Sequence, residues 1–224
     1  MCTSTIEPII PFHPYTYDVD EICSKLVELQ DGYVLQRFLL TGPGNGVRLS
    51  GFPDVEIYRQ LGEFILSLKK KVADRGIQVG WWCAPSLKSG KAEYQRITGI
   101  DGKVSQISSC PLDAEFRKTF TQNVATVAEI AKPFVIQFED DFELSNHRPV
   151  RFGCFCPLHL KEFAGRMRKK YSREDLLEIF TRVTPQSIQL RKAWAEMSRD
   201  SLTGLAGHIR QKIDKSFSFF HIQL

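Results

Sequence analysis

The chain has 224 residues, of which 42% are hydrophobic and 25% are charged, and its formal net charge is +4. This balance is typical of a soluble globular protein with one sizeable core, so we expect a single domain over residues 1–224. Acids are interleaved with the basic residues, so there is no basic stripe for nucleic acid. No apolar stretch approaches the roughly 20 residues of a membrane span, and the N-terminus lacks a signal-peptide pattern. We therefore expect a cytoplasmic protein that binds neither nucleic acid nor membrane.

The first half of the chain alternates short apolar runs with amphipathic periods. Apolar residues at helical spacing follow Asp18, and Gly32 is the predicted end of that helix. Asp54 is the predicted N-cap of the next helix, and Gly76 is its predicted stop. A stretch rich in Gly, Ser and Lys is interpreted as a loop that runs to about residue 109. The expected strands cover residues 6–12, 33–40 and 77–83, and the expected helices cover 18–29 and 54–72.

The second half of the chain continues this alternation. Apolar residues from Phe116 to Ile130 recur at helical spacing, and the helix should end before Pro133, because a proline disfavours helix at the preceding residue. An apolar run that ends in carboxylates predicts the fourth strand. Ser172 precedes acids that suit the first turn of a helix. The other expected elements are helices over 158–171 and 190–213, and the beginning of a fifth strand over 217–224.

Strands that alternate with helices predict an α/β fold with a parallel sheet. Two architectures fit, an open doubly wound sheet and a TIM-barrel-like (β/α)8 barrel. The glycine-rich stretch 42–46 lacks the ending of a phosphate-binding loop, and no dinucleotide motif follows the first strand, so we expect no organic cofactor. We favour the barrel. A barrel normally needs about 250 residues, so four to five β/α units lead us to expect a truncated barrel.

The run Phe-Val-Ile-Gln-Phe-Glu-Asp-Asp-Phe-Glu over residues 134–143 is an apolar strand that ends in Glu139, Asp140 and Asp141. Like charges repel and desolvation raises the pKa of a carboxyl group, so such clusters are enriched at sites of proton transfer or metal binding. Alternation along a strand places Gln137, Glu139 and Asp141 on one face and Asp140 on the other. A solvated junction between strand and loop is the alternative interpretation.

Three cysteines and a histidine form a second constellation, Cys110, Cys154, Cys156 and His159, with the local pattern Cys-x-Cys-x-x-His. Thiolates and imidazole suit zinc, and four such ligands would close a tetrahedral structural site. Cys110 lies after the loop of the third strand and the other three lie after the fourth strand. Such loops are neighbours on one face of a parallel barrel. Buried free cysteines or a redox pair are the alternative interpretations.

Residues 105–194 resemble glycoside hydrolase family 42, the β-galactosidases with a barrel catalytic domain. The fourth-strand motif of that family, Trp-Gln-Ile-Asp-Asn-Glu-Tyr, has Ile136-Gln-Phe-Glu-Asp-Asp-Phe142 in its place. Its Cys-x-Cys-x-x-Cys segment has Cys154-Phe-Cys-Pro-Leu-His159 in its place, and a broader group of barrel glycosidases has a similar Cys-Phe-Cys-Pro-x-His-Leu segment. The resemblance implies a barrel fold, a carbohydrate substrate and, as in several family members, a structural zinc.

The resemblance also implies roles for the acidic residues. By position, Asp141 replaces the acid/base Glu of the family, and Asp140 replaces the Asn before it. Asp is one methylene shorter than Glu, so Glu139 is a rival for the acid/base role. Asp140 is then a candidate for binding a sugar hydroxyl. A retaining glycosidase needs two carboxyl groups about 5–5.5 Å apart, and the nucleophile of the family lies on a seventh strand, which this chain does not reach.

Four other residues are candidates for substrate binding. Trp81 and Trp82 end the third strand, where an aromatic face can stack on a sugar ring, with core packing as the alternative. Arg37 lies within the second strand, and His147 lies in the loop after the acidic strand. Loop polarity alone explains His147 equally well, whereas a plain surface arginine is the less favoured interpretation of Arg37 because its neighbours are apolar.

The favoured hypothesis is a retaining glycoside hydrolase that acts on a carbohydrate. One alternative is a metal-dependent hydrolase in which Glu139, Asp140 and Asp141 bind magnesium, calcium or manganese, since these ions prefer oxygen ligands. The other alternative is a non-catalytic barrel that binds carbohydrate.

Overall fold

A parallel sheet lies at the centre of the fold. The computed structural model describes residues 8–44, 54–91, 93–140, 142–144, 149–150, 152–216 and 222–223. Within these residues, five parallel strands pair in the order β1 (Ile9–Phe12), β2 (Arg37–Gly42), β3 (Gln78–Cys83), β6 (Ile136–Phe138) and β7 (Ile222–Gln223).

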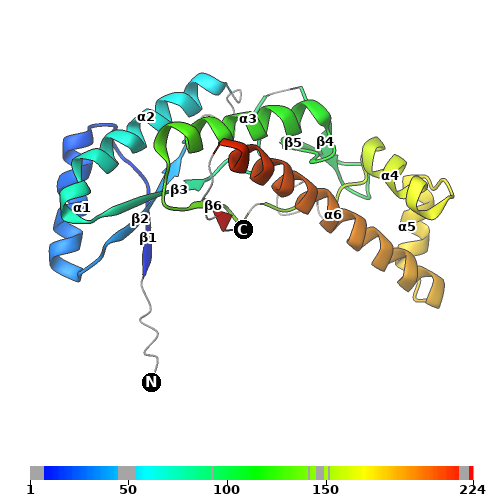
Figure 1. The fold of residues 1–224 in the computed structure, drawn as a ribbon. Coiled ribbons are helices and arrows are strands. Elements are labelled where there is room, and N and C mark those ends of the chain that lie inside the picture. The colour runs from blue at the N-terminus through cyan, green and yellow to red at the C-terminus, as the bar shows by residue number, and fades with distance from the viewer. Residues whose placement is uncertain are drawn as a thin grey trace.

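The order of these strands distinguishes the two architectures that the sequence left open. A doubly wound sheet reverses its strand order at a switch point, whereas a (β/α) barrel adds each strand on the same side of the last. The described strands follow the chain without a reversal, as in a barrel (Figure 1). The predicted α/β class with parallel strands is therefore confirmed. The described sheet is open, with β1 and β7 at its two edges.

Helices cover this sheet in the order of the chain. The crossover helices are α1 (Val19–Tyr33), α2 (Val55–Lys71), α3 (Ala114–Ala131) and α6 (Pro185–Ser216). Neighbours in this series pack together, α1 on α2, α2 on α3 and α3 on α6. Right-handed crossovers that all step in one direction produce such a single layer.

The ends of the helices follow from local chemistry. The side chain of Asp18 accepts hydrogen bonds from the backbone of Asp20 and Glu21, and Asp54 accepts one from the backbone of Glu56. The predicted N-cap at Asp54 is therefore confirmed. The predicted stop at Gly32 is wrong by one or two residues, because α1 continues to Tyr33 and ends in the left-handed conformation at Val34, which has φ 57°.

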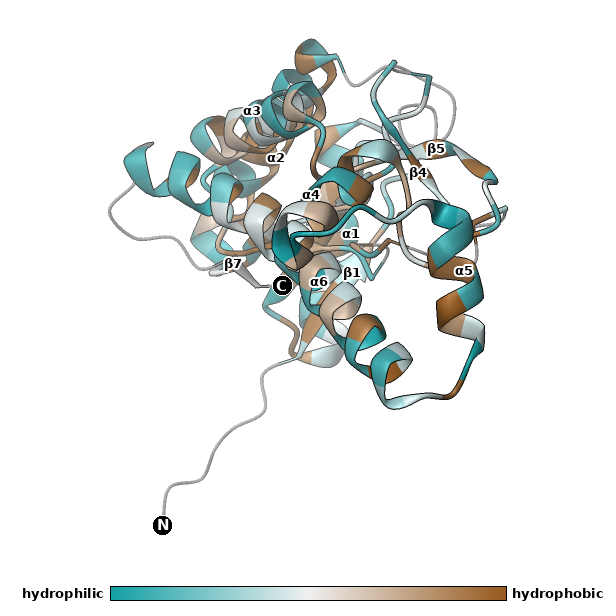
Figure 2. Cartoon of the chain, turned by 90° about the vertical axis from the view of Figure 1, so that its right-hand side faces the viewer, coloured by the Kyte–Doolittle hydropathy of each residue, from teal (hydrophilic) through white to brown (hydrophobic). Residues whose placement is uncertain are grey.

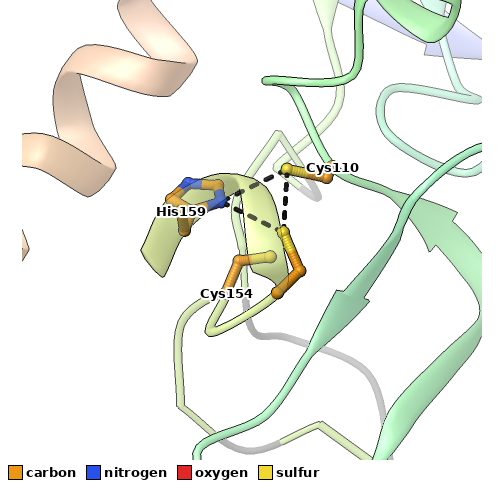
Figure 3. Close-up of side chains that lie close together, drawn as sticks. Cys110, Cys154 and His159 are labelled. Carbon is orange, nitrogen blue, oxygen red and sulfur yellow. Dashed lines mark hydrogen bonds between the residues drawn. The ribbon is translucent and has the colours of Figure 1, made fainter. Parts of the chain in front are cut away.

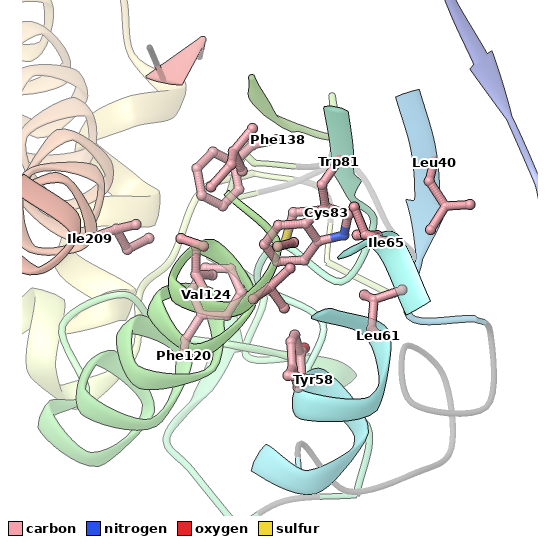
Figure 4. Close-up of a cluster of buried hydrophobic side chains, with 14 of the residues drawn as sticks. Leu40, Tyr58, Leu61, Ile65, Trp81, Cys83, Phe120, Val124, Phe138 and Ile209 are labelled. Carbon is pink, nitrogen blue, oxygen red and sulfur yellow. The ribbon is translucent and has the colours of Figure 1, made fainter. Parts of the chain in front are cut away.

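The main hydrophobic core fills the space between the sheet and the helices (Figure 4). Trp81 is fully buried, lies edge-on to Tyr58 of α2 with ring centroids 6.5 Å apart, and donates a hydrogen bond to the carbonyl of Gly42 over 2.9 Å. Phe120 and Val124 of α3 and Ile209 of α6 complete this layer, as Figure 4 shows.

The opposite face of the sheet is closely packed near the middle of β3. A Cβ atom on Gly80 would lie 2.7 Å from Leu39 Cδ2, 2.9 Å from Val135 Cγ1 and 3.0 Å from Phe134 Cε1. The neighbouring strands therefore need a residue without a side chain here. This apolar layer closes the sheet face below the residues at the strand ends.

The structure corrects three of the expected boundaries. The stretch interpreted as a loop contains an antiparallel hairpin, β4 (Arg96–Thr98) and β5 (Val104–Ser109), with Gly102 in its turn at φ 81°. The second strand begins at Arg37 and not at residue 33. The fourth strand, β6, ends at Phe138, so Glu139 and Asp140 follow the strand and are not part of it.

A second, smaller core lies beyond the hairpin. It joins α4 (Pro157–Met167), α5 (Arg173–Thr181) and the first half of α6 through six buried residues, Phe155, Phe163, Leu176, Leu190, Trp194 and Met197. The predicted helix start at Ser172 is confirmed by a capping box with Asp175. These helices lie at the far side of the molecule from α1 (Figure 1).

The helices carry alternating hydrophobic and hydrophilic stretches, as the hydropathy colours of Figure 2 show for α2, α3 and α6. Among the described helices, none is both long enough and apolar enough to cross a membrane.

Candidate functional site

A polar layer forms where the parallel strands end. In the register of the sheet Thr41 of β2 lies beside Trp82 of β3, and Trp82 lies beside Gln137 of β6. Since side chains alternate along a strand, these three residues point to the face opposite the buried Trp81. His13 follows β1, and its ring centroid lies 6.4 Å from that of Trp82. The carboxyl ends of four successive strands therefore present polar side chains on one face.

Two polar atoms of this layer are buried without a hydrogen bond. Neither Thr41 Oγ1 nor Trp82 Nε1 has a partner among the described residues, and the two residues are direct neighbours across β2 and β3. A buried polar atom that lacks a partner costs about 1–3 kcal/mol, so native structures rarely keep one without a reason. A hydroxyl and an indole N–H on the same face of the sheet can hydrogen-bond to a polar ligand.

Glu139 lies directly after β6 and is neutralised by a buried lysine. Lys88 Nζ lies 3.9 Å from Glu139 Oε2, and the two side chains are 2% and 12% exposed. A buried ion pair is stable only where both charges are held in place, because each has lost its water. Lys88 is therefore a fixed positive charge at the end of the sheet, beside the first carboxylate of the acidic run.

The loop that carries Lys88 is held by the hairpin. Ser89 donates its backbone N–H to Ile107, and Ser109 donates its backbone N–H to Leu87, each over 2.9 Å. Arg96 adds side-chain hydrogen bonds to Ser89 and to the carbonyl of Gly90.

Sequence reasoning missed both Lys88 and His13. A lysine in a loop rich in Gly and Ser gives no indication of burial, but His13 follows a predicted strand and could have been selected by its place.

The other predicted site residues fall in different places. Asp140 is exposed and lines a cleft of about 390 Å³ between the end of β6 and α6, with Glu139, Phe142 and Arg199 among the other lining residues. Asp141 and His147 lie outside the described residues.

Two further candidates are not brought to the strand ends. Trp81 belongs to the core on the helix side of the sheet. Arg37 lies at the first position of β2, the amino end, where its Nε donates a hydrogen bond to Gln78 Oε1 over 3.0 Å. It also lies over the ring of Phe134, 5.9 Å from the centroid.

The second constellation is brought together as expected. Cys110, Cys154, Cys156 and His159 are buried, and their ligand atoms all lie within 4.8 Å of one another (Figure 3). His159 Nδ1 lies 3.2 Å from the sulfur of Cys110 and 3.6 Å from that of Cys156, and these two sulfurs are 3.5 Å apart. The edges of a tetrahedral Cys and His zinc site are roughly 3.5–3.8 Å, from its usual bond lengths. The separations among Cys110, Cys156 and His159 are therefore close to those of a metal site.

The three thiols differ in how readily they ionise. All three cysteines are free. Burial raises the pKa of Cys110, and burial raises the pKa of Cys154 to about 12. Hydrogen bonding with Cys110 and Cys154 lowers the pKa of Cys156. A metal ion would stabilise all three as thiolates.

The local pattern explains how two cysteines reach one point. Gly153 has φ 48°, a conformation that favours glycine, and turns the chain into Cys154. Cys154 and Cys156 then point to one side, whereas Phe155 points to the other and stacks on Trp194 with ring centroids 4.2 Å apart. We call Cys110, Cys154, Cys156 and His159 the metal-type group. Because of the Cys-x-Cys spacing, the two cysteines join this group while the residue between them, Phe155, packs in the second core.

No protein-family model matches the chain, and no curated protein matches it significantly. Solved structures do match. The PgaB (BpsB) glycoside hydrolase domain from Bordetella bronchiseptica has a TM-score of 0.64 and 15% identity, over 97% of this chain and 64% of that one. The catalytic domain of the β-amylase from Paenibacillus polymyxa has a TM-score of 0.59 and 14% identity, over 96% of this chain and 65% of that one.

A third match, the α-L-fucosidase isoenzyme 2 from Paenibacillus thiaminolyticus, has a TM-score of 0.54 and 13% identity, over 97% of this chain and 32% of that one. The chain therefore has the fold of glycoside hydrolase catalytic domains and spans less than two thirds of the length of these structures. None of the three is named as a family 42 enzyme, and identities this low carry only the fold.

Proposed function

We propose that the protein belongs to a carbohydrate-acting hydrolase with a (β/α)-barrel catalytic domain. The observation that carries the proposal is the pair of buried, unsatisfied polar atoms on Thr41 and Trp82, which lie beside Gln137 at the carboxyl ends of the strands. In barrel enzymes the site is built at this end. A sugar offers hydroxyl groups for both atoms and an apolar ring face for the indole.

The acidic residues of this chain would supply the acid/base part of the chemistry. In a retaining mechanism one carboxyl group protonates the leaving oxygen and a second attacks the sugar carbon. Asp141 is our candidate acid/base, by its place in the family 42 resemblance, and Asp140 is the candidate for contact with a sugar hydroxyl. Glu139 remains the rival for that role, and its Oε2 lies 3.9 Å from Lys88 Nζ. With Asp141 as the acid/base, Glu139 and Lys88 would orient the substrate and its neighbouring carboxylates.

Binding and hydrolysis should be tested together. Wild-type protein would be screened on a glycan array and against a panel of aryl glycosides, and Asp141→Asn and Glu139→Gln would be compared on any substrate found. By the family 42 resemblance the nucleophile belongs to a seventh strand, so hydrolysis is expected only where that strand is present, and there Asp141→Asn should abolish hydrolysis while binding remains. The absence of carbohydrate binding across the panel would refute the proposal, and binding that is not joined by hydrolysis even when the seventh-strand nucleophile is present would favour a non-catalytic carbohydrate-binding barrel.

The Thr41 hydroxyl provides a sharper test. Thr41→Val removes a hydroxyl that has no hydrogen-bond partner among the described residues, so the melting temperature should stay the same or rise. Carbohydrate binding should weaken by about tenfold, the value of one hydrogen bond of roughly 1.4 kcal/mol. Calorimetric titration and thermal melts measure the two effects. The matched control is Thr126→Val at a half-buried position of α3, where the hydroxyl bonds to Gln122 of the same helix.

A metal-dependent hydrolase that uses Glu139, Asp140 and Asp141 is the alternative, and the ammonium of Lys88 near Glu139 disfavours a cation there. Chelation followed by the addition of single metal ions distinguishes this alternative from the proposed glycoside hydrolase. Activity lost on chelation and restored by zinc alone fits a structural metal. Activity restored by magnesium, calcium or manganese alone would support the alternative.

We also propose that the Cys110, Cys154, Cys156 and His159 group binds a structural zinc ion. The four protein ligands would fill a tetrahedral shell and leave no position for water or substrate, which distinguishes a structural site from a catalytic one. Metal analysis of purified protein should find about one zinc per chain. Folded protein that contains no zinc and takes none up would overturn this assignment.

A further inference from the structure

The helix α6 reaches the metal-type group through one side chain, Ser201. His159 Nε2 lies 3.2 Å from Ser201 Oγ, whereas Nδ1 of the same ring faces the sulfurs of Cys110 and Cys156. His159 is 0% exposed and Ser201 is 4% exposed, so no water competes for this contact. Ser201 lies 42 positions after His159 and belongs to a different helix.

The single proton of the Ser201 hydroxyl determines how it acts on the histidine. Ser201 Oγ donates that proton to the carbonyl of Ser198 over 2.7 Å. The oxygen can then only accept a hydrogen bond from His159, so Nε2 must carry the ring proton. In a neutral imidazole the other nitrogen, Nδ1, is then a bare lone pair. That lone pair points at the cysteine sulfurs, where a metal ion would sit.

We propose that Ser201 is a positioning residue that fixes the tautomer and orientation of His159 for metal binding. The proposal rests on the metal assignment made above. A ligating histidine commonly donates its second N–H to an acceptor that orients the ring and increases its basicity. Here the acceptor is a hydroxyl on α6, so the hydrogen bond also ties the longest helix of the described chain to the metal-type group.

The helix supplies a matched control for this role. Ser198 lies one turn before Ser201, and its own hydroxyl oxygen is buried without a hydrogen-bond partner among the described residues. Ser198→Ala removes a buried hydroxyl from the same helix but keeps the backbone carbonyl that accepts from Ser201. Ser201→Ala removes the acceptor of the histidine. Of the two variants, only Ser201→Ala removes the hydrogen-bond partner of His159.

Zinc affinity, measured by competition with a chromogenic chelator, is the first readout. We expect Ser201→Ala to weaken zinc binding by roughly 10–100-fold, the usual effect of removing such a partner, and Ser198→Ala to leave it unchanged. The visible spectrum of the cobalt-substituted protein should shift in Ser201→Ala alone. Equal affinity in all three proteins would overturn the proposal, and so would an equal loss in both variants, because that outcome indicates general helix packing.

The tautomer of His159 in the metal-free protein is the second readout. Nitrogen NMR of the neutral ring should show the proton on Nε2 in wild type and Ser198→Ala, and a mixture of tautomers in Ser201→Ala. A proton on Nδ1 in wild type would overturn the positioning role. If wild type binds no zinc but keeps the proton on Nε2, the metal assignment fails and the positioning of His159 by Ser201 stands.

Discussion

At the scale of single residues, Phe155 connects two parts of the molecule. It lies between two of the metal-type cysteines, donates its backbone N–H to Thr98 over 2.6 Å and buries its ring against Trp194. Its side chain is 2% exposed. A residue in this position stabilises the second core and also fixes the direction in which Cys154 and Cys156 point.

Phe155→Ala should therefore weaken both features. We expect a loss of about 3–5 kcal/mol in the free energy of unfolding, the usual cost of removing a buried phenylalanine. Zinc affinity should fall in the same variant. Urea denaturation and chelator competition provide the measurements. Phe152 is 66% exposed, so Phe152→Ala is the control and should change stability by less than about 0.5 kcal/mol. Similar losses in both variants would contradict this role.

The buried pair of Lys88 and Glu139 gives the second prediction at this scale. Lys88→Met leaves a buried carboxylate without its counter-ion, so stability should fall by about 3–5 kcal/mol. Adding Glu139→Gln to that variant should recover most of the loss, because the uncompensated charge is removed. Thermal and urea unfolding of the single and double variants would show this. The control is Lys118→Met, which breaks an exposed pair with Glu115 and should cost less than about 1 kcal/mol.

At the scale of elements, the hairpin of β4 and β5 supports the candidate site. Its strands hold the loop after β3 through backbone hydrogen bonds, and Arg96 donates from its Nη1 to Ser89 and Ser109, over 3.1 and 3.4 Å. The same guanidinium bonds to the carbonyl of Gly90 over 2.8 Å. The hairpin thereby determines where Lys88 lies.

Arg96→Met should release this loop without unfolding the sheet. Hydrogen bonds from a charged donor contribute about 1.5–3 kcal/mol each, so losing them should lower the free energy of local opening by at least roughly 1.4 kcal/mol. The backbone amides of Ser89 and Ser109 should then exchange with solvent about tenfold faster, and those of β2 should not change. Exchange measured by NMR would show the difference. Unchanged rates at Ser89 would mean that the hairpin alone holds the loop.

The elements differ in how far the sequence predicts them. Helical periodicity and the N-cap at Asp54 located α2 almost to the residue, because local forces determine a long amphipathic helix. The hairpin was missed, although Asp101-Gly102 is a typical turn pair, because β4 has only three residues and its pattern is too short to read. The burial of Lys88 depends on partners distant in sequence, so no local pattern indicates it. The cysteine group was predicted because its ligand types are distinctive.

At the scale of the whole molecule, two cores meet at the metal-type group. Cys110 follows the hairpin and precedes α3, which belongs to the main core, whereas His159 belongs to α4 of the second core. The strand order is a property of the whole molecule, because neither periodicity nor composition determines which strands become neighbours. The sequence favoured the barrel on motifs, and the described strands pair in parallel in the order of the chain.

Removing the metal should therefore destabilise the second core more than the main core. Zinc binding contributes to folding energy directly, because the unfolded chain holds no preformed site. For a chain of this size each kcal/mol shifts the melting temperature by about 2–4 °C, so losing even 3–5 kcal/mol should lower it by roughly 10 °C. Hydrogen exchange in the chelated protein should rise first in α4 and α5 and last in β2 and β3. Zinc, but not magnesium, should reverse both effects. If both cores of the chelated protein exchange at the same increased rate, the metal stabilises the fold as one unit. If exchange does not change, the four side chains hold the cores together without a metal.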